Sequence, residues 1–181
     1  MFGLFKKEKS MSEVSKDFAQ QFDIVRLILF EYFIEVIINA FKKQGDSITE
    51  EDAATYAAGV VTYLSGDDVD EWAKKLNEKQ QIVALAVIPN IKKQVDSVLA
   101  LDKSLREALV YTLRMKMIVK SWQQQSENTS DYLLKTPEGK RIGLLLNQYG
   151  SEFSDSPTPD GYKHLVYGLM MTAEARKKEK K

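Results

Sequence analysis

Residues 24–41 read IVRLILFEYFIEVIINAF, and fourteen of these eighteen positions are apolar. The four polar positions are Arg26, Glu31, Glu35 and Asn39. The last three fall on one narrow stripe at the helical spacing of 100° per residue. A helix that is apolar around most of its circumference packs against several neighbours. The stretch therefore predicts a long helix, over about 12–43, at the centre of a helical core.

The same stretch could be a membrane span, and its charges argue against one. Each charge at the bilayer centre costs roughly 2.5–3.5 kcal/mol, whereas each large aliphatic residue returns only roughly 0.3–0.6 kcal/mol. Arg26, Glu31 and Glu35 therefore cancel the gain from the apolar positions. The stretch is also at the short limit for a transmembrane helix. We expect no transmembrane span.

Further helices are indicated by side-chain oxygens that stand just before apolar helical runs. These N-cap positions lie near residues 49, 68, 104, 136 and 158. The apolar run at 82–88 is expected to be a buried helix, and Pro89 follows it, so residues 79–101 form either one kinked helix or two. The patterns predict an all-α, single-domain, irregular bundle of about six to eight helices around the long apolar central helix.

Two of the helix starts resemble each other. The sequence Thr136-Pro137-Glu138-Gly139 has a counterpart 22 residues later in Thr158-Pro159-Asp160-Gly161. Threonine at the cap, proline at the first helical position and a carboxylate next form a local helix-start signal. This local chemistry explains the similarity without an internal duplication.

The size and composition are those of one globular domain, with 181 residues, 44% of them hydrophobic and 29% charged. The chain has no cysteine, which excludes disulfides, thiolate metal sites and cysteine nucleophiles. We predict a flexible tip over 1–11, a helical domain over 12–175 and a basic tail over 176–181. A cysteine-free chain without a recognisable signal peptide indicates a cytoplasmic protein.

Charge is unevenly distributed, although the formal net charge is zero. Residues 1–9 carry three lysines and one glutamate, which gives +2, and residues 174–181 carry five basic and two acidic residues, which gives +3. The body between them is therefore at −5. A mildly acidic body is a poor electrostatic match for a phosphate backbone, so we expect no nucleic-acid partner.

The N-terminal tip places apolar side chains beside ammonium groups. Such a segment suits weak contact with an anionic membrane surface, and this makes the inner membrane surface an alternative location. The residues of this expected contact are Phe2, Leu4, Phe5, Lys6, Lys7 and Lys9.

The polar stripe of Glu31, Glu35 and Asn39 has three interpretations. Carboxylates four residues apart on a helix repel slightly and usually face water or a cation. The stripe therefore lines a solvated edge, pairs with basic residues of the helix that begins near residue 103, or lines a pocket that binds a metal or performs acid–base chemistry. We favour the first. The basic residues considered as partners are Arg106, Arg114, Lys116 and Lys120.

Sequence motifs give no catalytic, cofactor-binding or metal-binding residue. The chain has one histidine, His164, with no second histidine or Glu-x-x-His pairing that would suit zinc or di-iron. Its nine glycines form neither phosphate-binding loop pattern. We therefore expect no cofactor, and the balance favours a protein that is not an enzyme.

Two functions remain open. The first is a non-catalytic helical protein-interaction module that binds a protein partner or another copy of itself. The second is a helical protein that binds a small molecule or lipid in a pocket between helices, conceivably an enzyme. We favour the first, because apolar helical surface is plentiful and reactive residues are few.

Overall fold

The computed structural model describes residues 11–101, 103–124, 129–149 and 178. These residues form seven helices and no strands, so the predicted all-α fold is confirmed. The helices are α1 (Met11–Lys43), α2 (Glu50–Leu64), α3 (Val69–Ala73), α4 (Glu78–Leu101), α5 (Lys103–Gln123), α6 (Thr129–Lys135) and α7 (Pro137–Tyr149). The N-terminal tip, the expected cap near 158, His164 and most of the basic tail lie outside the described residues.

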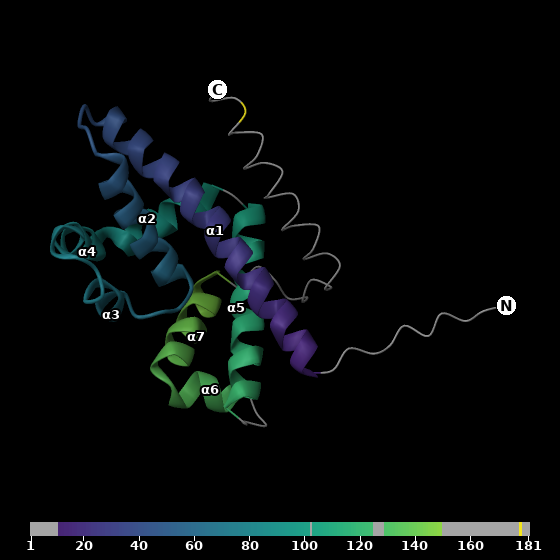
Figure 1. Cartoon of the computed structure of the whole chain (residues 1–181). Helices are drawn as coiled ribbons and strands as arrows, with labels where there is room; N and C mark the ends of the chain where they lie inside the picture. The colour runs from purple at the N-terminus through teal and green to yellow at the C-terminus, as the bar shows by residue number, and fades with distance from the viewer. Residues whose placement is uncertain (1–10, 102, 125–128, 150–177, 179–181) are drawn as a thin grey trace.

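The helices form two groups joined by α1 (Figure 1). One half of α1 packs against α2, which in turn packs against α4. The other half crosses α5, which contacts both α6 and α7. The short helix α3 fills the corner between α2 and α4. No described helix is long and apolar enough to cross a membrane.

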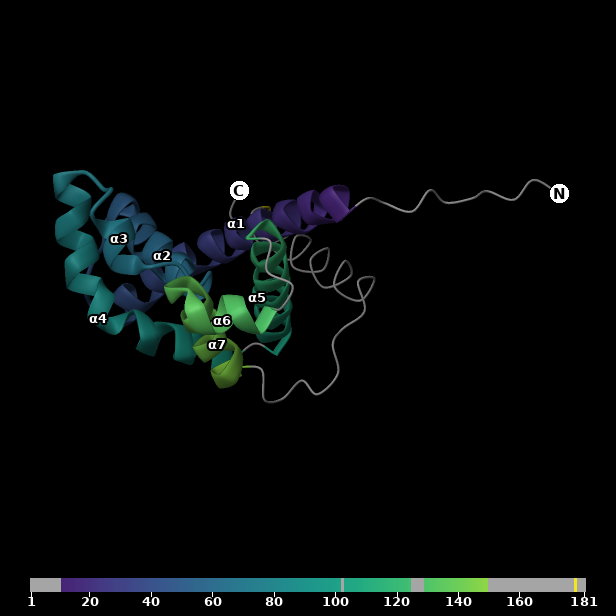
Figure 2. The ribbon, with the colours of Figure 1, turned by 90° about the horizontal axis from the view of Figure 1, so that it is seen from below.

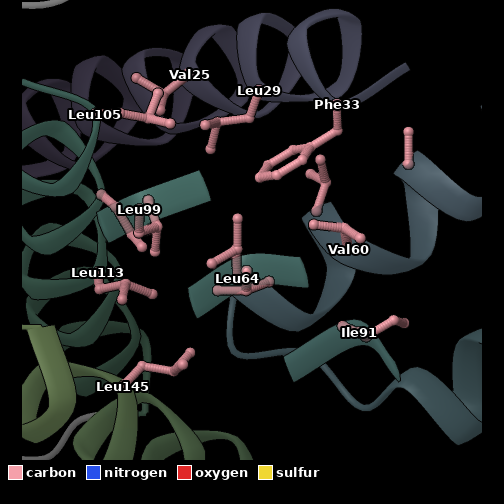
Figure 3. Packing of buried hydrophobic residues seen from close by; sticks show 14 of the residues in the cluster. Val25, Leu29, Phe33, Val60, Leu64, Ile91, Leu99, Leu105, Leu113 and Leu145 are labelled. Atoms are coloured by element: carbon pink, nitrogen blue, oxygen red, sulfur yellow. The ribbon is translucent and has the colours of Figure 1, made fainter. Parts of the chain in front are cut away.

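The core lies where the two groups meet beneath α1 (Figure 3). From α1, every fourth residue is buried, namely Val25, Leu29, Phe33 and Ile37. Burial of each such side chain contributes roughly 1.5–3 kcal/mol. Leu27 of α1, between two of these buried positions, is 60% exposed. The central position expected for this helix stays a prediction.

Helix starts are fixed by local side-chain chemistry. The Thr49 hydroxyl accepts a hydrogen bond from the Asp52 amide (3.1 Å) at the start of α2. The Asp68 carboxylate accepts hydrogen bonds from two amides at the start of α3. The Thr136 hydroxyl accepts one from the Gly139 amide (3.0 Å), with Pro137 as the first residue of α7. Each cap satisfies amides that the helix itself leaves without acceptors.

Residues 78–101 form one helix, α4, with Pro89 inside it. Proline has no amide proton, so the ladder loses one bond there, yet the helix continues and buries Ile91, Val95 and Leu99. The run at 82–88 is helical as expected, but the expectation that it is a buried helix is wrong for part of it. Ile82 and Leu85 are 68% and 65% exposed, because α2 and α3 cover only the opposite side of the helix.

The turn from α2 to α3 depends on Gly66, whose φ of +76° lies in the left-handed region. A Cβ atom at this position would also overlap the Ile142 side chain of α7. Glycine is the residue that tolerates both constraints. The turn brings Asp67 against α5 and α7, where the first candidate site lies.

Candidate functional site

Lys116 of α5 is a largely buried charged group with three oxygen partners. Its side chain is only 9% exposed, and its ammonium donates to the Ser65 carbonyl (2.8 Å), Asp67 Oδ1 (2.8 Å) and Glu138 Oε1 (2.7 Å). An ammonium has three protons to donate, and all three are used here. We call Lys116 and these three partners the Lys116 cluster. It ties the α2–α3 turn and α7 to α5.

The neighbouring elements position the two carboxylates. Asp67 follows the left-handed Gly66, which directs the chain back toward α5. Glu138 is the second residue of α7, whose start is set by the cap of Thr136. A carboxylate in the first turn of a helix is also stabilised by the positive end of the helix dipole. The sequence therefore places both carboxylates by local turn and cap chemistry.

Burial and neighbouring charges shift the pKa values of Glu138 and of the nearby Tyr132. Burial alone raises the pKa of Glu138, but the hydrogen bond and charge of Lys116 outweigh it and hold that pKa below its usual value. The neighbouring Tyr132 hydroxyl is buried and forms no well-aligned hydrogen bond. Burial first, and then the charge of Glu138, raise the pKa of this tyrosine. At neutral pH the neutral phenol of Tyr132 therefore lies beside the ionised carboxylate of Glu138.

The fall in the pKa of Glu138 makes stability depend on pH. The carboxylate of Glu138 releases its proton at a lower pH in the folded chain than in the unfolded chain. Its contribution to the free energy of unfolding is therefore complete above the ordinary pKa of 4.5 and is lost as the pH falls below that value. In Glu138→Gln we expect this part of the acid sensitivity to be absent. Urea midpoints measured at a series of pH values check this, with Asp46→Asn, in the exposed α1–α2 loop, as the control. Parallel pH profiles for Glu138→Gln and the wild type would contradict it.

A cavity of about 320 Å³ lies beside the cluster, between α1 and α5. The ring of Phe22 faces the ammonium of Lys116 (5.1 Å to the ring centroid) and the guanidinium of Arg26 (5.6 Å). Its charged lining consists of Arg26, Lys116 and Lys120 against Asp23, Asp67 and Glu138. Three positive and three negative groups balance, so the cavity has no net attraction for an ion of either sign.

The predicted polar stripe lies on α1, with Glu31 and Glu35 half-buried and Asn39 exposed. None of the three lines the cavity beside the cluster. Lys116, one of the basic residues considered as a partner for the stripe, bonds to Asp67 and Glu138. Within the described residues, no group of three or more acidic or histidine side chains is placed to hold a metal ion. A solvated-edge role for the stripe stays a prediction.

The second candidate site is the exposed side of α4. Ile82, Leu85, Ala86 and Pro89 are all exposed, at the i, i+3, i+4 and i+7 spacing of one helix face. Glu78 and Lys93 are exposed at the two ends of the same face. We call these six residues the α4 outer face.

The opposite side of α4 is buried and includes Ala84, Ile91 and Val95. A helix at the surface of a bundle usually has one apolar side and one polar side. The first half of α4 instead carries apolar residues on both sides, and Figure 2 shows α4 at the outer edge of the bundle. Sequence reasoning missed this face, because the apolar run at 82–88 has no periodicity to show which residues point outward.

No protein-family model, curated protein or solved structure matches the chain. A proposal about its function therefore has to be argued from the geometry of the Lys116 cluster and of the α4 outer face.

Proposed function

We propose that the chain is a helical protein-interaction module and that the α4 outer face is its contact surface. The observation that carries this proposal is the exposure of Ile82 and Leu85 on a helix whose other side is buried in the core. Single exposed apolar residues are ordinary on protein surfaces, but an aligned set marks a site of interaction. Aligned apolar residues on one helix face are also how helices contact grooves and other helices.

The energetics support a contact surface at this place. Full burial of an isoleucine or leucine contributes roughly 1.5–3 kcal/mol. Ile82 and Leu85 keep about two thirds of their surface exposed, so most of this gain is still available to a partner. The backbone beneath them is already ordered by the packing of Ala84 and Ile91, which lowers the entropic cost of binding.

The Lys116 cluster supports the same proposal, because it acts as structure rather than as chemistry. A lysine that acts as a nucleophile or general base needs a free, neutral amine, whereas the Lys116 ammonium uses all its protons in contacts with oxygen. Lysine in this arrangement fixes α5, α7 and the α2–α3 turn relative to one another. The result is a rigid scaffold behind α4.

The alternative of a ligand pocket between helices would use the cavity beside Phe22. Its volume of about 320 Å³ is at the lower end for a small-molecule site. The balanced charges and the saturated ammonium of Lys116 leave few polar groups to orient a ligand. A contact between apolar helix faces does not need polar groups to orient a ligand, so we rank the interaction module first.

Photo-crosslinking tests the proposed surface. A photo-reactive amino acid in place of Leu85 is expected to give covalent adducts with protein under ultraviolet light, in cells that express the chain. Leu144 of α7 provides a matched control, because it is 70% exposed but is not part of the α4 outer face. Adducts at position 85 but not at 144 support the proposal. Equal labelling at both positions would show that the contact at position 85 is not specific to this face, and no labelling at 85 would show that the face binds no protein; either result overturns the proposal.

A further inference from the structure

The α4 outer face is complementary to itself. We propose that it binds the same face of a second copy of the chain, with the two α4 helices antiparallel about a two-fold axis between Leu85 and Ala86. This inference rests on the proposed function and names its partner. It is carried by the order of apolar and charged residues along one exposed helix face.

The apolar residues match when the helix is turned around. About an axis between Leu85 and Ala86, Leu85 lies opposite the partner's Ala86, and Ile82 lies opposite the partner's Pro89. The large Leu85 side chain thus meets a small one, which is the alternation that helix–helix packing requires. A two-fold axis repeats each contact, so every complementary pair occurs twice.

The charged residues match in the same register. Glu78 lies opposite the partner's Lys93, since each is about seven and a half residues from the axis. The two residues are fifteen positions apart, or about 22 Å at 1.5 Å per residue, so a parallel arrangement would place like charges together. Lys92, next to Lys93, adds a second positive charge near the partner's Glu78. Opposite charges at the two ends of an apolar stripe therefore specify an antiparallel second copy.

The nearby charge that would oppose this pairing is already neutralised within the chain. Lys79 stands next to Glu78, and its ammonium bonds to Glu51 of α2 at 2.9 Å. It is thus held toward α2 and away from the axis. Any partner of this face needs an apolar stripe with a positive charge opposite Glu78 and a negative charge opposite Lys93. A second copy of α4, placed antiparallel, has this arrangement.

The apolar part of the face spans eight residues, 82–89, or about 10 Å of helix, so the dimer is expected to be weak and to depend on concentration. Sedimentation velocity over a wide range of concentrations measures it. Leu85→Glu is expected to raise the dimer Kd by roughly tenfold or more, because it places two charges at the centre of the interface. Leu144→Glu introduces the same change at an equally exposed leucine of α7 and is expected to leave the Kd unchanged.

A charge exchange tests the register itself. Glu78→Lys places like charges opposite one another at both ends of the interface, and so does Lys93→Glu, so each is expected to weaken the dimer. The double variant Glu78→Lys/Lys93→Glu restores opposite charges and is expected to recover the dimer. Glu78 is the first residue of α4, so Glu78→Lys also disturbs the helix dipole, and the helical content of each variant is measured by circular dichroism.

The outcomes separate this inference from the proposed function. A dimer that Leu85→Glu dissociates and the charge exchange restores supports the antiparallel pairing. A chain that is monomeric at every concentration overturns it, and so does a dimer that neither change affects. If position 85 crosslinks to a different protein while the chain stays monomeric, the interaction module stands and the self-pairing fails. If position 85 crosslinks to nothing, both fail.

Discussion

Lys116→Met is expected to lower the free energy of unfolding by about 3 kcal/mol. Methionine has a similar length but cannot donate hydrogen bonds, so Asp67, Glu138 and the Ser65 carbonyl lose their shared donor. Breaking a buried ion pair by removing one partner costs about 3–5 kcal/mol. The lower end applies here, because the Asp67 and Glu138 side chains keep 35% and 29% of their surface exposed. Urea unfolding of the two proteins gives the difference.

The matched control is Lys74→Met. The ammonium of Lys74 also meets a carboxylate, that of Glu71, at 2.6 Å, but its side chain is 69% exposed. Exposed ion pairs contribute little to stability because water screens them, so Lys74→Met is expected to be nearly neutral. A similar small loss for Lys116→Met would show that the cluster does not hold the turn and α7 to α5.

Gly139→Ala is expected to destabilise the chain by about 3 kcal/mol. A Cβ atom at position 139 would overlap the Tyr132 carbonyl oxygen, and it would lie 2.8 Å from the Thr136 hydroxyl. The overlapped atom is main chain and cannot rotate away, so α6 and α7 would have to separate at their corner. Forced overpacking of this kind costs typically about 1–3 kcal/mol, and the rigid main chain places this site at the upper end.

Gly143→Ala, one turn further along α7, is the control for that substitution. The nearest atom to its added Cβ would be Leu133 Cδ2 at 3.5 Å, an ordinary contact with a side chain. Alanine is the better helix former by about 1 kcal/mol, so this variant is expected to be neutral or more stable. Thermal melts of both variants separate the two effects. If Gly139→Ala also melted at or above the wild-type temperature, the close approach of α6 and α7 would be wrong.

The helices could be predicted because their signals are local. Thr49 stands just before an acidic run and an apolar run, and the structure has it as the cap of α2. Thr136 and Pro137 start α7 in the same way. In each case the side chain and the amide that it satisfies are three residues apart, so the sequence contains the whole interaction.

The Lys116 cluster could not be predicted, because its members are distant along the chain. Asp67 lies 49 residues before Lys116, and no sequence pattern joins them. One signal did exist. Lys116 falls on the same face of α5 as the buried Leu105 and Leu109, at helical spacing. A charge in line with buried leucines predicts a buried ion, although not the identity of its partners.

The α4 outer face could not be predicted for a different reason, because the sequence around it is uniformly apolar. Ile82–Ile88 is apolar at every position, so no residue stands out as facing water. Ala84 is fully buried and Leu85 mostly exposed, although their neighbours in sequence are equally apolar. The packing of α2 and α3 decides which side is covered, and that choice depends on the whole bundle.

The Lys116 cluster also bears on the order in which the chain folds. The Lys116 ammonium loses its water favourably only when the oxygens of the α2–α3 turn and of Glu138 are already in place. Bringing Asp67 to Lys116 requires closing a loop of 49 residues. The helices and the apolar core must therefore assemble before the cluster closes. Interactions that form after the folding barrier slow unfolding and leave the folding rate nearly unchanged. We therefore expect Lys116 to affect how long the native state lasts, rather than how quickly it is reached.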